Sequence, residues 1–386
     1  MIVAGGCYFE LCEHPNWRAL RGSGGRAAMA LAGLSPGVAL KTYYPPRRLS
    51  DLTSIETSGI EIVASASQTP IAFAYFHALS DPVMAPQSVE IAPNAPIHAS
   101  GEAVLRFGLI EGTAVVSANR AVYDPQSARG FEPFDQNGSR ASELAIVLNE
   151  RELCGLGNSA NLEEAARVSI AQGNASILIA KGGIRGATLF VDKEPPIRIP
   201  AYRSNRVFKI GTGDVFSAAF AHYWGERQLD PYSSAILASR SVATYSETRN
   251  LPLPPPEGLG DLTPVDSQSF RPVCVVGSPR ALGARWLLEE ARWRLQQLGL
   301  EAAAPSLDGA EPQQVDIAKY GSVLALMDHL DDVANQLLDR ARRAGVRIVW
   351  FRQLEASTVS DAYIDESCTE DFTTALYWAG WAAAQQ

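Results

Sequence analysis

The segment ASELAIVLNERELCGL, residues 141–156, carries the clearest fold signal in the chain. Its apolar run LAIVL is typical of a buried parallel strand, and the residues after it predict a turn and then a helix. The same alternation recurs on both sides, where the runs MIVAG, IEIVAS, TAVVSA and SILIA predict further strands between helical segments. This alternation predicts an α/β layered domain with a mostly parallel sheet.

A proline-rich segment divides the chain of 386 residues. Residues 251–270 read LPLPPPEGLGDLTPVDSQSF, with five prolines and no helical or strand period. They predict a stiff linker between a domain of residues 1–250 and a second domain of residues 271–386. In the second domain, VCVVG, SVLALM and VRIVWF predict strands, and ALGARWLLEEARWRLQQLG predicts a helix closed by Gly299. The order of these elements predicts a smaller Rossmann-like unit.

Composition narrows the class of protein. Hydrophobic residues make up 46% of the chain and charged residues 19%, with a net charge of −9, which is globular and argues against a broad nucleic-acid surface. No apolar stretch is long enough for a membrane span, and MIVAGGCYFE does not read as a signal peptide. The five scattered cysteines, without CxxC or HExxH, fit a reduced, cytoplasmic protein without structural zinc.

The stretch FKIGTGDVF, residues 208–216, has the features of a phosphate-binding loop. Gly211 and Gly213, on either side of Thr212, let the backbone turn its N–H groups toward one point, and the helix that follows directs its positive end there. Asp214 would then accept the proton of an attacking hydroxyl group. No GK[ST] follows, so this is not a Walker A loop. The alternative is a tight turn with Asp214 as the N-cap of the helix.

Asn149 and Glu152 follow the strand LAIVL directly, at the end where open α/β sheets bind ligands. They could hold Mg²⁺, directly or through water, beside the phosphates of a nucleotide. A capping box, with Asn149 as N-cap and Glu152 three residues later, is the interpretation that the residues alone favour.

Two further segments are rich in glycine. KGGIRG, residues 181–186, would let a nucleotide approach the backbone closely, or would form a hairpin turn before the strand ATLFV. GSGGR, residues 22–26, precedes an alanine-rich helix and would bind a small polar ligand, or would serve close packing of helix against sheet.

The order and spacing of these four motifs resemble the ribokinase-type, or PfkB, carbohydrate and nucleoside kinases over residues 1–250. The resemblance implies a three-layer α/β/α domain with a small β lid that includes TPIAFAYF. It implies an anion hole at Gly211, Thr212 and Gly213 with Asp214 as base, and Mg²⁺ organised by Asn149 and Glu152. The implied ATP contacts fall on Lys181, Gly183, Arg185, Gly186 and Asn250, and the implied substrate contacts on Glu10, Gly24 and Gly25.

The sequence departs from the family pattern at three places. The family usually has Asp-Thr before the GxGD loop, where Phe208 and Lys209 stand here. Lys209 could add positive charge near the phosphates or could be solvated. Met29 takes the place of a usual Asn, and Glu10 is the acid nearest to a usual substrate-binding Asp. The phosphate-transfer motifs are therefore matched better than the substrate motifs.

The second domain resembles the nucleoside 2-deoxyribosyltransferases in the strand VCVVG, the GSP turn and the order of its elements. Those enzymes use a Glu nucleophile, whereas MDHLDDVANQLLDRA, residues 327–341, contains no Glu and an amide cannot form the glycosyl ester. We therefore expect a ligand-binding module with Gly277, Ser278 and Asp328 near its crevice. A purely structural or oligomerising domain is the alternative.

Together these features predict a kinase that uses ATP and Mg²⁺ to phosphorylate a hydroxyl group of a sugar or nucleoside. Two other functions stay open. One is a nucleotide- or nucleoside-binding sensor with little turnover, and the other is a bifunctional nucleoside salvage enzyme with an active glycosyl-transfer domain. The expected partners are small molecules, not nucleic acid or membrane. The oligomeric state is open, with a homodimer as one option.

Overall fold

The computed structural model describes residues 1–126, 132–265, 269–353 and 367–384. These form two compact units. The first comprises Met1–Gly182, Gly186–Ser204 and Lys209–Thr263, and the second comprises Gly183–Arg185, Asn205–Phe208 and Pro264–Gln386. The boundary at Thr263 lies inside the segment predicted as a linker. The start of that segment packs within the first unit, because Leu253 is buried and its N–H donates to the carbonyl oxygen of Ala30 at 3.0 Å.

The first unit is built on a nine-stranded sheet with the strand order β13-β12-β11-β10-β9-β8-β1-β4-β5. Its strands are β1 (Ile2–Ala4), β4 (Ala39–Tyr44), β5 (Glu61–Ala66), β8 (Ile97–Phe107), β9 (Ala114–Asp124), β10 (Arg140–Asn149), β11 (Ile177–Lys181), β12 (Ala187–Val191) and β13 (Ile197–Ile199). Neighbours from β11 to β5 pair in parallel, and only the β11-β12 and β12-β13 pairs are antiparallel. The run LAIVL is buried in the middle of this sheet. The mixed α/β fold with a mostly parallel sheet is confirmed.

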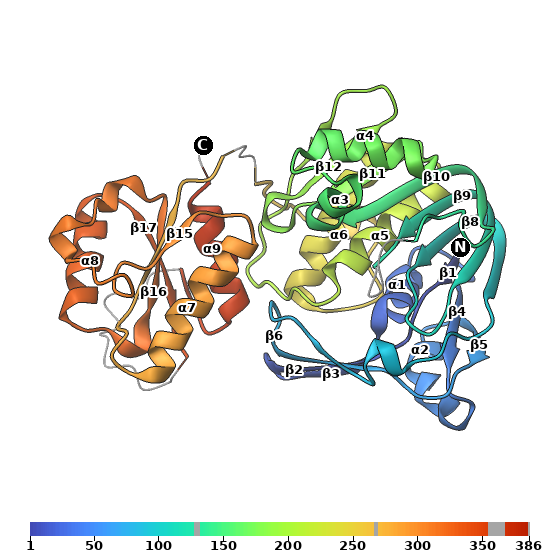
Figure 1. The fold of residues 1–386 in the computed structure, drawn as a ribbon, viewed down its shortest axis with the longest axis horizontal. Helices are drawn as coiled ribbons and strands as arrows, with labels where there is room; N and C mark the ends of the chain where they lie inside the picture. The colour runs from blue at the N-terminus through green and yellow to red at the C-terminus, as the bar shows by residue number, and fades with distance from the viewer. Residues whose placement is uncertain (127–131, 266–268, 354–366, 385–386) are drawn as a thin grey trace. The chain divides into compact units, whose positions relative to one another are not determined.

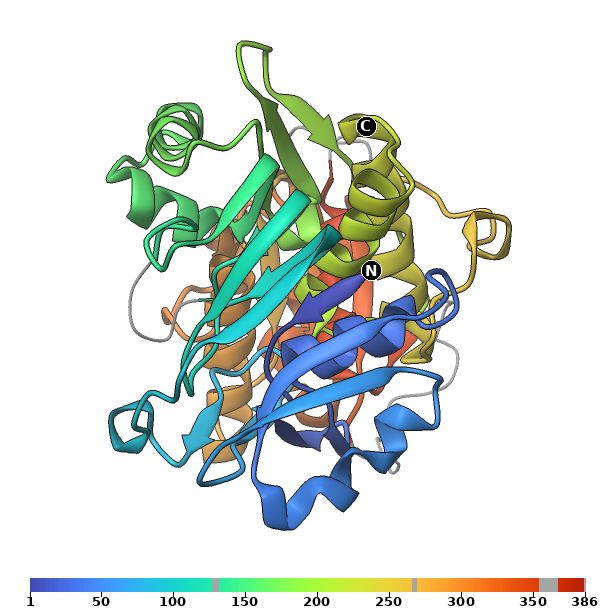
Figure 2. The ribbon, with the colours of Figure 1, turned by 90° about the vertical axis from the view of Figure 1, so that its right-hand side faces the viewer.

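Helices cover both faces of this sheet. They are α1 (Gly22–Leu31), α2 (Thr53–Glu56), α3 (Glu150–Gly157), α4 (Leu162–Gly173), α5 (Thr212–Phe220) and α6 (Pro231–Thr248). The crossover from β1 to β4 and the crossover from β10 to β11 run in opposite directions along the sheet, so right-handed connections place their helices on opposite faces. Accordingly, α3 packs with α4, and α5 packs with both α1 and α6 (Figures 1 and 2).

A separate four-stranded sheet of the first unit has the order β3-β2-β6-β7. It consists of β2 (Phe9–His14), β3 (Trp17–Leu20), β6 (Ala72–His77) and β7 (Val83–Ala85). The predicted strand TPIAFAYF contributes β6, so this sheet stands where the family resemblance implies a small lid. Its apolar side chains Leu11, Phe76 and Val83 are exposed.

The second unit has a parallel sheet with the order β15-β14-β16-β17-β18. Its strands are β14 (Val273–Val276), β15 (Ala302–Ala303), β16 (Ser322–Leu326), β17 (Arg347–Phe351) and β18 (Cys368–Thr369), and its helices are α7 (Leu282–Gln297), α8 (Asp332–Arg343) and α9 (Phe372–Ala382). Asp331 caps α8 by accepting a hydrogen bond from the N–H of Ala334 at 2.9 Å. The three predicted strands are present as β14, β16 and β17 and the predicted helix as α7, so this unit has the small α/β fold expected.

The structure differs from the sequence predictions at the helix starts. No turn separates β10 from α3, because Asn149 ends the strand and is also the N-cap of the helix. Helix α1 begins at Gly22 and therefore includes the glycines predicted as a loop. The helix predicted to follow the GTGD loop begins inside it, at Thr212, and continues as a π-helix over Ala221–Glu226. Close packing around glycine residues, described in the next subsection, explains why α1 and α5 begin where they do.

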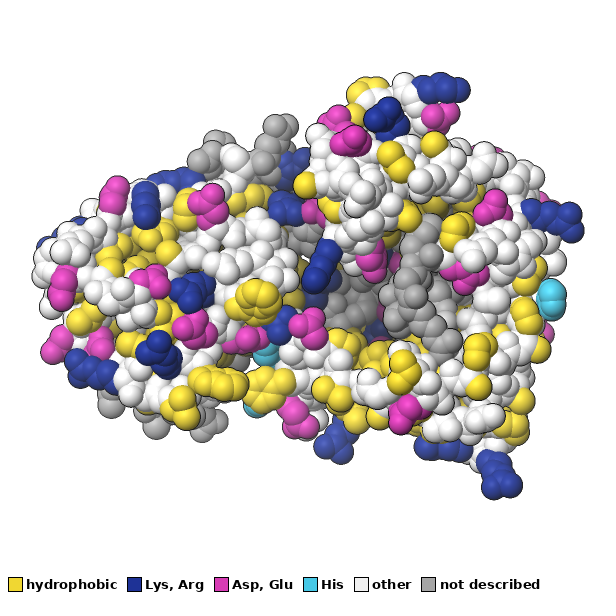
Figure 3. Space-filling model, viewed as in Figure 1, with side chains coloured by type: hydrophobic (Ala, Val, Ile, Leu, Met, Phe, Trp, Pro, Cys, Tyr) yellow, Lys and Arg dark blue, Asp and Glu magenta, His cyan; other side chains and the backbone are white. Residues whose placement is uncertain are grey.

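The surface is mixed in charge. Acidic and basic side chains are interspersed over the described part of the face seen in Figure 3. In the described ranges, no helix has both the length and the hydropathy that crossing a bilayer requires.

Candidate active site

The GTGD loop lies at the start of α5, with Gly211 as the N-cap in the left-handed region at a φ of +76°. Thr212 begins the helix, and its hydroxyl group donates to the carbonyl oxygen of Lys209 at 3.0 Å. Asp214 lies within the first turn, so it is not the N-cap, and the alternative interpretation of this residue is wrong. Its side chain points instead to partners on other elements.

Arg26 on α1 holds Asp214 in place. Its Nη1 donates to Oδ2 of Asp214 at 2.8 Å, and its Nη2 forms an ion pair with Glu10 of β2. Arg26 is 1% exposed. Burial alone would lower the pKa of this guanidinium, but Glu10 and Asp214 raise it well above its usual value. Glu10, Arg26 and Asp214 thus form a buried row of charges, which we call the Glu10–Arg26–Asp214 cluster.

Two further residues complete the surroundings of Asp214. The Nε2 of Gln126, just after β9, donates to Oδ1 of Asp214 at 2.6 Å. The hydroxyl oxygen of Tyr245 on α6 accepts from Nε of Arg26 at 3.1 Å and lies 3.2 Å from the carbonyl oxygen of Ile210, to which it donates. Both carboxylate oxygens of Asp214 are therefore oriented by side chains from distant parts of the first unit.

Gly211 leaves the space that Arg26 occupies. A Cβ atom at position 211 would lie 2.0 Å from Nε and Cζ of Arg26, so the absence of a side chain allows the guanidinium to reach Asp214. The glycines of α1 have a similar role, because a Cβ at Gly24 would lie 2.3 Å from the carbonyl oxygen of Gly5. A Cβ at Gly25 would lie 3.1 Å from Ile55. Close packing thus explains both glycines, and their substrate role stays a prediction.

The substitution Gly211→Ala tests this packing. We expect it to lower the free energy of unfolding by more than the about 1–3 kcal/mol of left-handed backbone strain, because the new methyl group also displaces Arg26. Gly37→Ala is the matched control, since Gly37 has a φ of +71° and a Cβ there would meet nothing within 4 Å. Urea unfolding measures both variants. Equal losses in the two variants would contradict the packing role.

A second group of charges lies beside the loop. Nζ of Lys181 donates to Oδ2 of Asp124 at 2.6 Å, and the hydroxyl group of Ser217 donates to the same oxygen at 2.7 Å. Burial raises the pKa of Asp124 to about 6, although Lys181 opposes the shift. The Oδ1 atom of Asp124 is buried without a hydrogen-bond partner in the structure, which is uncommon for a carboxylate.

Asn149 and Glu152 form the predicted capping box. The Oδ1 atom of Asn149 accepts from the N–H of Glu152 at 2.8 Å, and Oε2 of Glu152 accepts from the N–H of Asn149 at 2.9 Å. In the described ranges, no group of three or more His, Cys, Asp and Glu side chains is arranged to hold a metal ion. The role of the pair toward Mg²⁺ stays a prediction.

The predicted nucleotide-binding turn is a hairpin. Strands β11 and β12 are antiparallel, and the N–H of Gly182 donates to the carbonyl oxygen of Gly186 at 2.7 Å. Gly183–Arg185 forms the short helical turn η3 of this hairpin and groups with the second unit. Asn250 is exposed just after α6, and its N–H donates to the hydroxyl group of Thr248 at 3.2 Å. The nucleotide contacts proposed for Gly183, Arg185, Gly186 and Asn250 stay predictions.

The residues predicted for the second domain line one pocket. Gly277, Ser278 and Asp328 lie at the ends of β14 and β16 with Leu288 and Leu326 beside them. One carboxylate oxygen of Asp328 accepts from the N–H of Gln353 at 2.6 Å. The pocket brings the three predicted residues together, but its ligand stays a prediction.

The sequence analysis missed Arg26, Asp124, Gln126 and Tyr245 as parts of the site. Signals for three of them are present in the sequence. Asp124 and Gln126 follow the end of a strand, where polar side chains of an α/β sheet gather, and Arg26 comes directly after Gly24 and Gly25. Tyr245 has no such signal, because its contact to Arg26 spans 219 positions in the chain.

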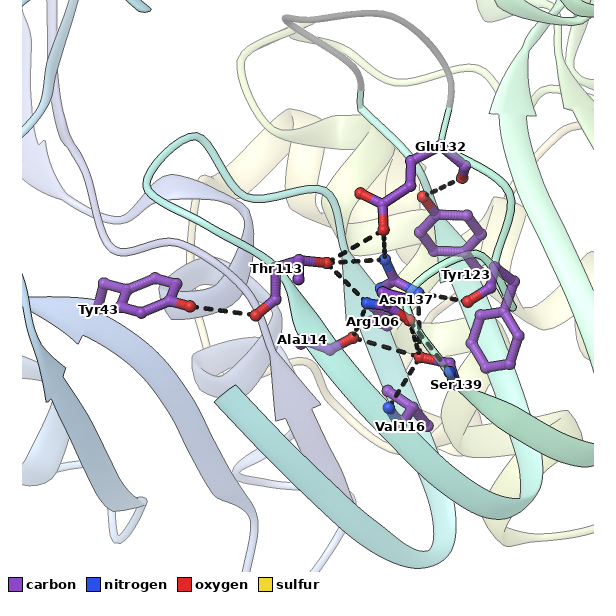
Figure 4. A network of polar contacts seen from close by, with 10 residues as sticks. Tyr43, Arg106, Thr113, Ala114, Val116, Tyr123, Glu132, Asn137 and Ser139 are labelled. Atoms are coloured by element: carbon purple, nitrogen blue, oxygen red, sulfur yellow. Dashed lines mark hydrogen bonds and ion pairs between the residues drawn. The ribbon is translucent and has the colours of Figure 1, made fainter. Parts of the chain in front are cut away.

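Another buried arginine, Arg106 on β8, contacts residues 132–139. Its guanidinium donates to the carbonyl oxygen of Phe134 at 2.8 Å and to Oε1 of Glu132 at 3.0 Å, and it lies 4.6 Å from the ring centre of Tyr123 (Figure 4). Ser139 adds a further contact at 3.2 Å. This network anchors residues 132–139 to the sheet.

Solved structures of ribokinase-family kinases resemble the chain. A ribokinase from Thermotoga maritima is 16% identical over 67% of this chain and 97% of its own, with a TM-score of 0.48. The ribokinase of Arabidopsis thaliana, complexed with ribose and ATP, is 13% identical over 67% of this chain and 96% of its own, with a TM-score of 0.48. A pyrophosphate-dependent kinase in the ribokinase family, complexed with a pyrophosphate analog and myo-inositol, is 16% identical over 67% and 98%, with a TM-score of 0.45. No protein-family model and no curated protein matches the chain.

Proposed function

We propose that the first unit transfers a phosphoryl group from ATP to a hydroxyl group of a sugar or nucleoside. The observation that carries the proposal is the position of Asp214, in the first turn of α5 next to Gly211 and oriented by Arg26 and Gln126. A carboxylate held beside the positive end of a helix is the pairing of base and anion site that phosphoryl transfer needs.

Asp214 acts as the base in this reaction. The acceptor hydroxyl group gives its proton to the carboxylate while its oxygen forms a bond to the phosphorus atom. The bond from phosphorus to the leaving oxygen breaks, and its electron pair stays on the leaving phosphate. Arg26 and Gln126 each occupy one lone pair of Asp214, and a carboxylate has about four such positions. The hydrogen bonds therefore orient the base without blocking it.

The loop stabilises the transferred group. The N–H groups of Gly213 and Asp214 belong to the first turn of α5 and have no acceptor within the helix. They and the helix dipole favour the negative charge of the phosphoryl oxygens in the transition state. The four-stranded lid sheet supplies Glu10 to the cluster behind the base, so lid and loop are linked through Arg26.

The side chains near the loop fit a divalent cation held mainly by the donor. Mg²⁺ in phosphotransferases is bound by one or two carboxylates together with the phosphates and water. Glu152, with Asn149, would hold it, directly or through water, and Asp124 offers an unpartnered oxygen close by. When bound, Mg²⁺ neutralises charge on the donor phosphates.

An acceptor screen tests the proposal. The protein is incubated with Mg-ATP and a panel of sugars and nucleosides, and the release of ADP is followed. We expect ADP release that requires one class of acceptor. Tight ligand binding without turnover against every acceptor would overturn the proposal and favour a sensor. Release of free base from a nucleoside without ATP would instead indicate glycosyl transfer by the second unit.

A further inference from the structure

Lys209 is a partly buried cation beside the GTGD loop. Its Nζ donates to the hydroxyl oxygen of Thr212 at 2.8 Å, and it forms no ion pair with any residue in the described ranges. A lysine in this setting keeps most of the cost of leaving water, because the charge of Asp214 offsets that cost only in part. The hydroxyl group that it contacts belongs to the GTGD loop, so the ammonium group lies at the proposed phosphate site.

Lys181 approaches the same loop from β11. A Cβ atom built on Gly213 would lie 3.4 Å from its Nζ, so the ammonium group faces the loop directly. Lys181 is paired with Asp124, but Ser217 shares that carboxylate oxygen. Lys181 is close enough to Lys209 for their like charges to repel, which adds to the effect of burial on Lys209. Two cations that converge on a small loop are stabilised when an anion lies between them.

We propose that Lys209 and Lys181 bind the terminal phosphate of the phosphoryl donor, at a position that we call the two-lysine site. This inference rests on the proposed function, because it places the donor at the GTGD loop. A phosphate dianion supplies acceptor oxygens to both ammonium groups and to the N–H groups of the loop. The terminal phosphate of a nucleoside triphosphate and inorganic pyrophosphate share this chemistry, and direct binding measurements distinguish them.

Phosphate binding at the two-lysine site should depend on pH. Burial, then repulsion by Lys181, lowers the pKa of Lys209 to about 8, and Asp214 opposes the shift. Arg26, which packs at Gly211, and Lys181 both have raised pKa values and stay charged. Lys209 therefore loses its proton first as the pH rises. Inorganic phosphate, pyrophosphate and ATP only gain negative charge as the pH rises, so a loss of binding between pH 7.5 and 9.5 reports the charge of Lys209.

The experiment measures binding without any acceptor. Titration calorimetry gives the dissociation constants of inorganic phosphate, pyrophosphate and ATP at pH 7.5 and 9.5 for the natural protein, Lys209→Met, Lys209→Arg and the control Lys193→Met. Lys193 is 88% exposed, and its ion pair among the described residues is with its neighbour Asp192. We expect Lys209→Met to weaken binding at least about tenfold at pH 7.5, as loss of a charge-assisted hydrogen bond does, and Lys193→Met to leave it unchanged.

The pH series separates a direct role from a structural one. The natural protein should bind more weakly at pH 9.5, whereas Lys209→Arg should bind no more weakly at pH 9.5 than at pH 7.5 because arginine stays charged. An effect on pyrophosphate but not ATP would identify an inorganic donor, and an effect on both would identify the shared terminal phosphate. Unchanged binding of all three probes in folded Lys209→Met would overturn the two-lysine site. If the natural protein binds the phosphate probes but phosphorylates no acceptor, the result would contradict the proposed function and not the two-lysine site.

Discussion

Asp214→Asn is expected to lower kcat for acceptor-dependent ADP release by about 10²–10⁴-fold, the usual contribution of a general base. The amide has nearly the same shape, and its oxygen can still accept from Nη1 of Arg26 as the carboxylate does at 2.8 Å. It cannot take a proton from the acceptor hydroxyl group. Donor binding, measured in the same preparation, should change far less than kcat, because the proton moves only in the transition state.

Asp230→Asn is the matched control for Asp214→Asn. Asp230 caps α6 through a hydrogen bond from the N–H of Ser233 at 2.9 Å, and asparagine caps helices as well as aspartate does. This variant should keep full activity. If Asp214→Asn kept activity within a few fold of the natural protein, Asp214 would not be the base.

Arg26→Met should lower the free energy of unfolding of the first unit by about 3–5 kcal/mol, which is the cost of removing one partner from a buried ion pair. The change leaves the carboxylates of Glu10 and Asp214 buried without their shared cation. Denaturant unfolding, followed by the transition of the first unit, measures the loss.

Two further variants interpret the Arg26→Met result. Arg48→Met removes an arginine that is 48% exposed and paired with Asp51 at 2.8 Å, so we expect a loss of less than about 1 kcal/mol. The double variant Glu10→Gln with Arg26→Met should be more stable than Arg26→Met alone, because one uncompensated charge is gone. A double variant as unstable as the sum of both single variants would show that charge is not the cause.

Features that depend on residues close together in the sequence, such as strands and helix caps, could be predicted from the sequence. The apolar run LAIVL is a buried strand because parallel strands covered on both faces need apolar residues on both. The capping box of Asn149 and Glu152 also formed as predicted, since its two hydrogen bonds join residues three apart. Helix starts at Gly22 and Thr212 were missed, because glycine is a poor helix former and packing overrode that preference.

The partners of Asp214 could not be predicted in the same way. The family resemblance implies a substrate contact for Glu10, which stays a prediction, and gives no sign of the ion pair with Arg26 that the structure shows. No periodicity relates Arg26 to Asp214 or Gln126, since these contacts depend on which strands and helices become neighbours. The GTGD loop could therefore be found from its glycines, but the side chains that orient Asp214 could not.

The Arg26–Asp214 contact joins positions 188 apart in the chain, and the contact of Arg26 with Tyr245 joins positions 219 apart. Contacts at such separations form only after large loops close, so they form late in folding. A chain still being synthesised lacks the contact of Arg26 with Tyr245 until residue 245 has left the ribosome. Recovery of the proposed activity after dilution from denaturant should accordingly lag behind recovery of helical circular dichroism, which would make turnover a direct report of completed assembly.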